Sequence, residues 1–280
     1  MNVVRTKSIL LALASVVPVA GCSSDSSGGN GNLSVVLEPE ETITEGLASG
    51  DCDECILDGY SVSFSRYIVS VGFVAMSQVD GANAQDSTDV GVADFASLPS
   101  TLPELTSFNG IPTGQYTSFG YETPAPGSGV ININSVDGED IDAMVQNGWT
   151  YIVEGTLTQN GGDSIDFLIE ADAPAVYTDC ALADAEPGVP VTSNSDVTLT
   201  IHGDHIFFNG FPDEEGNVQR LAQWMWTIGE EQDTDGVITR EDFEAATNIE
   251  ELFPTPVYQL DRSPVSPIQN AWDFVRGQLG

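Results

Sequence analysis

Apolar and polar residues alternate along most of the chain between residues 33 and 208, which is the period of strands with one buried face. The clearest case is Tyr60-Ser-Val-Ser-Phe-Ser, in which Tyr60, Val62 and Phe64 alternate with serines. Arg66 then interrupts the alternation, so we expect a bulge there and a second strand from about residue 68 to 76. The same pattern predicts further strands at 33–37, 90–95, 116–122, 130–133, 149–159, 164–171 and 196–208.

Turn signals separate these strands. Asn-Gly-Gly-Asp at 160–163 lies between two alternating segments and is typical of a β-hairpin, because glycine readily adopts positive φ. Three prolines predict a connection over 98–114, since proline cannot donate a hydrogen bond to a sheet. A single helical turn is expected at 140–146. Residues 33–210 are therefore predicted to form an antiparallel β-sandwich-like domain, because a parallel sheet would need crossover helices that this pattern lacks.

After Gly210 the period of the apolar residues changes to 3.6, which is typical of amphipathic helices. The apolar stripes are Val218, Leu221, Trp224 or Met225, and Ile228; then Phe243, Ala246 and Ile249; then Ile268, Trp272 and Val275. The third helix is expected over 266–279, with Pro267 in its first turn. The predicted fold class is therefore mainly β with a C-terminal α region, a sandwich-like body followed by a helical region over 211–280.

The segment 231–242, Glu-Gln-Asp-Thr-Asp-Gly-Val-Ile-Thr-Arg-Glu-Asp, lies between the first two of these helices. Oxygen ligands occupy the positions that a 12-residue calcium loop requires, and Gly236 stands where such a loop turns sharply. The ligand positions are filled by Glu231, Asp233, Asp235, the Val237 carbonyl, Thr239 and Asp242. The segment resembles an EF-hand, and the resemblance implies that it binds Ca²⁺.

Two positions depart from the usual EF-hand. Glu231 replaces Asp at the first position, and Asp242 replaces the bidentate Glu at the last. A shorter final carboxylate reaches the ion less well, so the affinity for Ca²⁺ should be lower. No second loop with this spacing occurs in the sequence, which favours a structural staple over a calcium sensor. The alternative is an acidic helix-turn-helix without an ion.

His202-Gly-Asp-His205 holds both histidines of the chain. Imidazole nitrogens are common ligands of copper and zinc, so His202 and His205 are candidates for a transition-metal site. In a regular strand, residues three apart point to opposite faces, and the site would need Gly203 to bend the chain. Asp204 or Cys180 could complete the ligand shell. The alternative is a structural role at the edge of the sandwich.

Residues 1–21 have the features of an export signal, with Arg5 and Lys7 before an apolar stretch. Val-Ala-Gly before Cys22 resembles a bacterial lipobox, and the resemblance implies cleavage before Cys22, which leaves Cys22 as the acylated N-terminus. Residues 22–32 are small and polar, so we expect a flexible tether between the lipid and the domain. The protein is therefore predicted to be anchored by lipid in the bacterial cell envelope, at the outer membrane or the cell surface.

The chain carries 43 acidic residues, and its seven Lys and Arg residues include the two in the leader. A surface this acidic repels phosphate, so we expect no nucleic-acid partner. Beyond the lipidated Cys22, three cysteines remain. Cys52 and Cys55 could pair with each other, or one of them could pair with Cys180, and the sequence favours neither.

The combination of a strand ending in His-Gly-Asp-His, a helix, the loop and a second helix resembles the C-terminal region of uncharacterised predicted bacterial lipoproteins. The resemblance covers about residues 149–258 and implies a β-rich envelope lipoprotein with Ca²⁺. The predicted role is structural or ligand-binding, with a protein or glycan as the unidentified ligand. One alternative is a copper- or zinc-binding protein that uses the two histidines. The other is an envelope hydrolase, although the sequence contains no nucleophile-elbow, zinc-protease or phosphate-loop motif.

Overall fold

A computed structural model of the chain describes residues 29–182, 187–211, 218–232 and 236–280. The predicted leader, Cys22 and the loop residues Asp233 and Asp235 lie outside these ranges. The strands are β1 Asn30–Glu38, β2 Tyr60–Ser77, β3 Gln85–Asp86, β4 Val90–Asp94, β5 Glu104–Pro112, β6 Gly114–Tyr116, β7 Ser118–Thr123, β8 Ile131–Asn132, β9 Tyr151–Gln159, β10 Ser164–Ala171, β11 Ala175–Tyr177, β12 Val189–Val191, β13 Ser195–Thr200 and β14 Val237–Ile238. The helices are α1 Glu41–Thr44, α2 Gly138–Asn147, α3 Gln223–Glu231, α4 Arg240–Ala245, α5 Ile249–Leu252 and α6 Ala271–Leu279.

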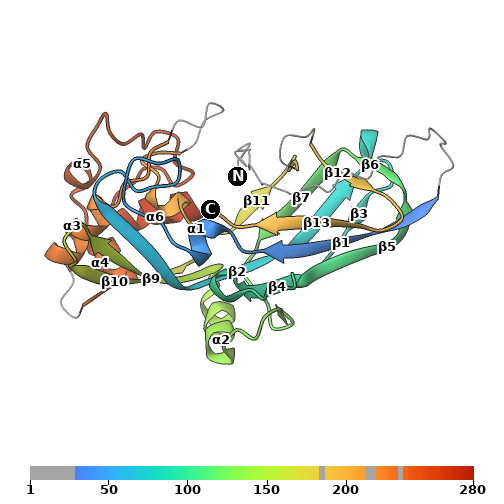
Figure 1. Cartoon of the computed structure of the whole chain (residues 1–280), viewed down its shortest axis with the longest axis horizontal. Helices are drawn as coiled ribbons and strands as arrows, with labels where there is room; N and C mark the ends of the chain where they lie inside the picture. Colours follow the sequence, from blue (N-terminus) through green and yellow to red (C-terminus); the bar gives the residue numbers. More distant parts are fainter. Residues whose placement is uncertain (1–28, 183–186, 212–217, 233–235) are drawn as a thin grey trace.

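The fold is mainly β with helices in the C-terminal region, as the sequence predicted (Figure 1). The large sheet is built around β2, which pairs with β9 along its first half and with β4, β7 and β3 further on. The predicted bulge is confirmed by a register shift between Phe64 and Arg66 opposite β9, but the second strand expected from about residue 68 is the continuation of β2. The predicted hairpin is confirmed as well, since β9 and β10 pair in register on either side of 160–163.

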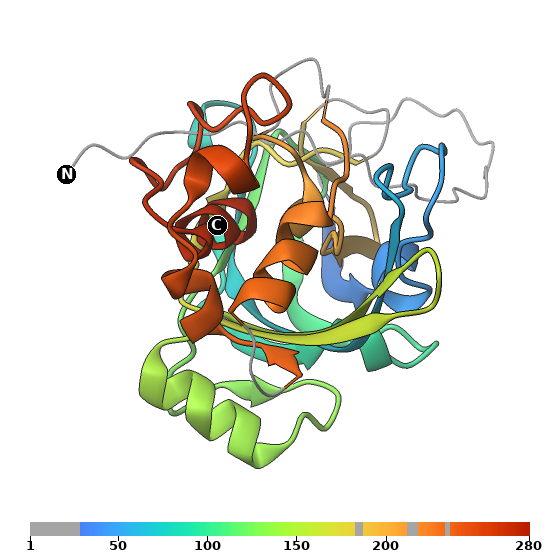
Figure 2. The same cartoon turned by 90° about the vertical axis from the view of Figure 1, so that its left-hand side faces the viewer.

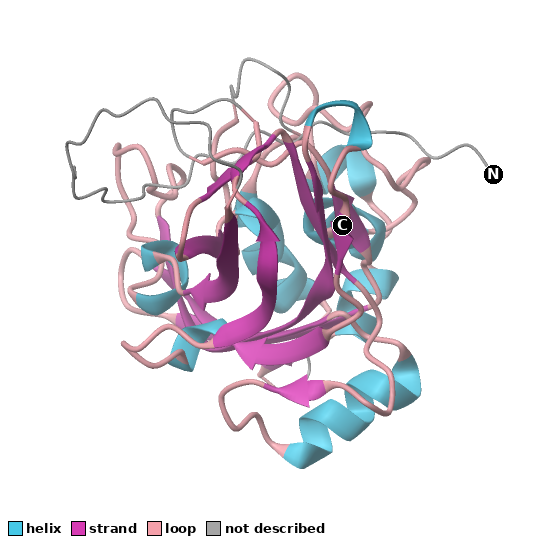
Figure 3. Ribbon diagram, turned by 90° about the vertical axis from the view of Figure 1, so that its right-hand side faces the viewer, coloured by secondary structure: helices cyan, strands magenta, loops and turns pink. Residues whose placement is uncertain are grey.

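A smaller sheet has the order β13-β1-β5 (Figure 1) and contributes to the same core as the large sheet. Figure 3 shows the strands in the middle of the molecule with helices around them. Leu33, Val35 and Leu37 alternate with more exposed residues along β1 and are buried. The expectation of purely antiparallel pairing was wrong, because β1 pairs with β13 in parallel. Parallel strands need a long connection, which is usually a crossover helix. Here β1 and β13 are far apart in sequence, and the long stretch of chain between them serves as that connection.

Several expected elements of the β body have different bounds in the structure. Residues 98–114 contain strand β5, because Pro103 and Pro112 stand at its ends and β5 is an edge strand, where proline is tolerated. Helix α2 is longer than one turn because the Asp137 side chain caps its N-terminus and left-handed Gly148 ends it. Strand β13 stops at Thr200, and the chain then turns through a 3-10 helix over His205–Phe207.

The C-terminal helices gather at one end of the molecule beside β10 (Figures 1 and 2). Helix α3 begins later than expected, at Gln223, and the second helix divides into α4 and α5. Helix α6 begins at Ala271 because Asn270 caps it, so Pro267 lies before the helix and not in its first turn. Trp224, Phe243, Phe253 and Phe274 are buried together and join the core of the sheets.

Within the part of the chain that the structure describes, no helix is both long and apolar enough to span a membrane.

Candidate functional site

The predicted calcium loop begins at the end of α3. Glu231 is the last residue of this helix and its side chain is exposed. The N-terminus of α3 is held against the body by Asp58, whose Oδ2 accepts hydrogen bonds from the backbone N–H groups of Ala222 and Gln223 at 2.8 Å each. Trp224 and Ile228 bury one face of the helix in the core. The entry side of the loop is therefore fixed by the sheets.

The second half of the predicted loop pairs with the large sheet directly after Gly236. Gly236 has a φ of +95° at the predicted sharp turn, a conformation that favours glycine. Strand β14 follows and pairs in parallel with Asp166 and Phe167 of β10. Ile238 is completely buried there. The Val237 carbonyl and Thr239, both predicted ligands, thus lie on a segment that is anchored to the large sheet.

Asp242 occupies the third position of α4 and forms a capping box with Thr239. Its Oδ2 accepts hydrogen bonds from the backbone N–H and the hydroxyl of Thr239, each at 2.8 Å. Its Oδ1 accepts no hydrogen bond from any residue that the structure describes. Among the described residues, Asp242 therefore uses one carboxylate oxygen, Oδ2, to cap the helix. Bidentate binding, the usual role of Glu at this position, is not available to it.

The two histidines come together on the turn after β13. Gly203 permits this turn, because a Cβ atom there would lie 2.7 Å from Cγ1 of Ile43. The His202 and His205 rings stack with their centroids 5.3 Å apart and an interplanar angle of 9°. Ligand atoms of His202, Asp204 and His205 all lie within 4.8 Å of one another. The chain bends between β13 and the 3-10 helix, as a shared site of the two histidines requires, so they are not held on opposite faces of a regular strand.

Glu40, at the end of β1 and the start of α1, orients His202. Its Oε1 lies 2.6 Å from Nδ1 of His202, and Tyr67 donates a hydrogen bond to the His202 carbonyl at 3.3 Å. Nε2 of His202 is buried and has no hydrogen-bond partner among the described residues. Burial disfavours the imidazolium form, but the hydrogen bond and negative charge of Glu40 outweigh burial and raise the pKa of His202.

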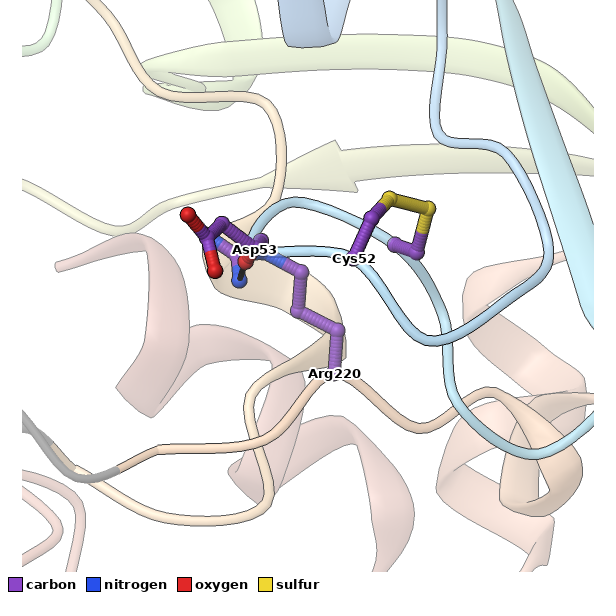
Figure 4. Close-up of a disulfide and its surroundings, with 4 residues drawn as sticks. Cys52, Asp53 and Arg220 are labelled. Carbon is purple, nitrogen blue, oxygen red and sulfur yellow. Dashed lines mark hydrogen bonds between the residues drawn. A yellow bond between two sulfur atoms is a disulfide. The ribbon is translucent and has the colours of Figure 1, made fainter.

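Asp204 forms a buried ion pair with Arg220. The Asp204 side chain is 3% exposed and that of Arg220 is 16% exposed. Nε of Arg220 donates to Oδ2 of Asp204 at 2.7 Å, and Nη1 donates to the Asp53 carbonyl (Figure 4). Oδ1 of Asp204 is buried and, in the described ranges, has no partner. Arg220 thus compensates the charge of Asp204 while leaving one carboxylate oxygen unused.

His205 completes the cluster and packs between His202 and the Phe208 ring, whose centroid is 4.8 Å away. Burial lowers the pKa of His205 to about 4, so its imidazole is neutral at ordinary pH. Both histidines line a cavity of about 20 Å³ together with Tyr67, Tyr121, Tyr151 and Tyr177. This volume accommodates about one water molecule.

The structure resolves the cysteine pairing that the sequence left open. Cys52 and Cys55 form a disulfide, and Cys180 is free (Figure 4). Cys180 lines a neighbouring apolar cavity with Tyr121 and Thr200 and is not part of the His202–Asp204–His205 group. Burial raises the pKa of its thiol to about 11. Of the two proposed companions of the histidines, Asp204 is in place and Cys180 is not.

Sequence reasoning missed Glu40 and Arg220. Glu40 is far from His202 in the chain and lies among many other acidic residues, so no local pattern distinguishes it. Arg220 carried a weak signal, because an arginine in so acidic a chain is expected to be paired.

Comparison of the chain with protein-family models, with curated proteins and with solved structures gives no match.

Proposed function

We propose that the protein is a lipid-anchored protein of the bacterial cell envelope that binds one Ca²⁺ ion through residues 231–242. Its role is structural or ligand-binding, and the ion links the end of α3 to the start of α4. The observation that carries the proposal is the agreement of the ligand spacing with the turn at Gly236, supported by an Oδ1 of Asp242 that has no partner among the described residues. Lipid anchoring through Cys22 is supported by the lipobox resemblance.

The structure of the flanking elements indicates what the ion would add. Helices α3 and α4 already meet through the Trp224 and Phe243 rings, whose centroids are 5.9 Å apart, and Ile238 is buried beside them. Ca²⁺ would therefore reinforce a formed hairpin and would not be needed to create it. With a monodentate Asp242, we expect a dissociation constant of roughly 10⁻⁴ to 10⁻³ M, the range of extracellular calcium modules.

Calcium titration tests this proposal. With that affinity, about 10 mM Ca²⁺ stabilises the folded protein by about 1.4 to 2.7 kcal/mol through ligand linkage. The melting temperature should rise by several degrees, and Asp233→Asn and Asp235→Asn should each abolish most of the rise. Asp163→Asn is the matched control, because it removes one exposed charge in the β9–β10 turn. A rise that survives both loop substitutions, or no rise in the parent, contradicts calcium binding at this loop.

Substitution of Cys22 tests the anchor. In a bacterial host, Cys22→Ser should move the protein from the membrane fraction to the soluble fraction, because the thiol that accepts the lipid is gone. Ser23→Ala should leave it in the membrane fraction. Mass spectrometry of the N-terminus reports the lipid directly, and an unmodified Cys22 in membrane-bound protein would refute this part of the proposal.

A further inference from the structure

The cluster around His202 contains two buried polar atoms that the fold leaves without partners. Nε2 of His202 and Oδ1 of Asp204 have no hydrogen-bond partner among the described residues, although both atoms are buried. Such groups are rare in folded proteins, because leaving a buried polar atom unsatisfied costs about 1 to 3 kcal/mol. Both atoms are good metal ligands, and both belong to the same group of three side chains. A ligand that satisfies them together is therefore indicated.

Each of these two side chains is also held by a second residue. Oε1 of Glu40 lies 2.6 Å from Nδ1 of His202, which leaves Nε2 as the ring nitrogen available to a ligand. Arg220 binds Oδ2 of Asp204 and leaves Oδ1. In metal sites a ligating histidine almost always donates its other ring N–H to a carboxylate or carbonyl, and ligating carboxylates are hydrogen-bonded in the same way. The pairs Glu40–His202 and Arg220–Asp204 have this arrangement.

We propose that His202, Asp204 and His205 bind a divalent transition metal ion, Zn²⁺ or Cu²⁺. Two imidazoles and one carboxylate suit these ions, whereas Ca²⁺ prefers oxygen ligands alone. Three protein ligands leave one tetrahedral position open, and the adjoining cavity of about 20 Å³ admits a water molecule there. This site is separate from residues 231–242 and does not rest on the calcium proposal.

Metal binding requires a small movement. The ligand atoms now lie up to 4.8 Å apart, whereas a tetrahedral zinc ion with bonds of about 2.0 Å holds its ligands about 3.3 Å from one another. His205 is only partly buried, and rotation of its ring can bring its nitrogen closer while Glu40 and Arg220 hold the other two ligands.

The test is zinc binding by the untagged protein after removal of metals with a chelator. Excess Ca²⁺ is present throughout, so that the acidic loop does not contribute. We expect one equivalent of zinc per chain, measured by calorimetry and by elemental analysis, and Cu²⁺ should compete for the same site. Asp233→Asn should bind zinc like the parent. If the parent binds no zinc, the buried atoms are satisfied by water and the proposal is wrong.

Substitutions distinguish this site from non-specific binding to an acidic surface. His202→Gln and His205→Gln should each abolish stoichiometric binding. Glu40→Gln should lower the affinity by about 10- to 100-fold, because it acts only through the orientation of His202. Glu41→Gln, an exposed neighbour with the same change of charge, should have no effect. Zinc that still binds to the double His202→Gln/His205→Gln variant would overturn the proposal.

A measurement on the parent protein avoids any effect of the substitutions on folding. The chain has two histidines, so a nitrogen-15 spectrum of the imidazoles reports these residues alone. One equivalent of zinc should shift Nε2 of His202, whereas Nδ1 should keep its hydrogen bond to Glu40. Imidazole resonances that do not respond to zinc would exclude histidine ligation.

Discussion

At the scale of single residues, the turn at Gly236 can be tested by its backbone conformation alone. A Cβ atom added there meets nothing within 4 Å, but its φ of +95° is rarely adopted by other residues. Gly236→Ala should therefore lower the free energy of unfolding by about 1 to 3 kcal/mol in the absence of calcium. Gly138→Ala is the matched control, because Gly138 also has open space and begins α2 without a positive φ.

Urea unfolding of the two variants measures this difference. Gly138→Ala should be neutral or stabilising by up to about 1 kcal/mol, because alanine favours the helix. If Gly236→Ala is as stable as Gly138→Ala, the positive φ at the loop does not exist in solution.

The site residues show how far single-residue reasoning extends. His202 and His205 could be selected from the sequence because they are the only histidines. Glu40 could not, because the contact between Glu40 and His202 depends on how β1 and the turn after β13 meet in the folded chain. The chemistry of the individual side chains was predictable, but the selection of one carboxylate among 43 was not.

At the scale of elements, alternation predicted strands well wherever one face is buried. The long strand β2 with its bulge, β4, and the β9–β10 hairpin follow from local pattern. Strand β5 did not follow from the local pattern, because prolines usually argue against a strand. In the structure these prolines lie at the ends of β5, and β5 is an edge strand, where a missing backbone N–H donor is tolerated. Whether a proline is tolerated depends on the neighbouring strand, which the local sequence does not contain.

The helical elements were predicted in type but not in extent. Their apolar stripes indicated helices but did not indicate where each helix begins. Helix α3 begins where Asp58 accepts hydrogen bonds from the backbone N–H groups of Ala222 and Gln223. Asp58 lies in the loop before β2, far from α3 in sequence. Helix α6 illustrates the opposite case, because its start at Ala271 follows from the local cap at Asn270.

At the scale of the whole molecule, acidic charge dominates. The formal net charge is −36, and four of the arginines outside the leader, Arg66, Arg220, Arg240 and Arg276, form ion pairs with carboxylates. Most acidic residues therefore repel one another across the surface. Folding brings them closer than they are in the unfolded chain, so this repulsion opposes stability.

Salt should therefore stabilise the protein. Raising the ionic strength from about 0.15 M to 1 M shortens the Debye length from about 8 Å to 3 Å and screens the repulsion. The melting temperature at pH 7 should rise with sodium chloride, as differential scanning calorimetry can measure. Near the sequence pI of about 4.1, where the net charge vanishes, the same salt series should have a much smaller effect. A melting temperature that is constant or falls with salt at pH 7 contradicts this reasoning.

The sequence by itself determined the fold class, the hairpin, the change from strands to helices after Gly210 and the position of Gly236, because each depends on residues that are close together in the chain. Only the tertiary structure decided the parallel pairing of β1 with β13, the Cys52–Cys55 disulfide and the partners of His202 and Asp204. The physical reason is the same in most of these cases. Burial and electrostatic pairing act between segments that are distant in sequence, and a local pattern records that a side chain needs a partner without specifying which one it finds.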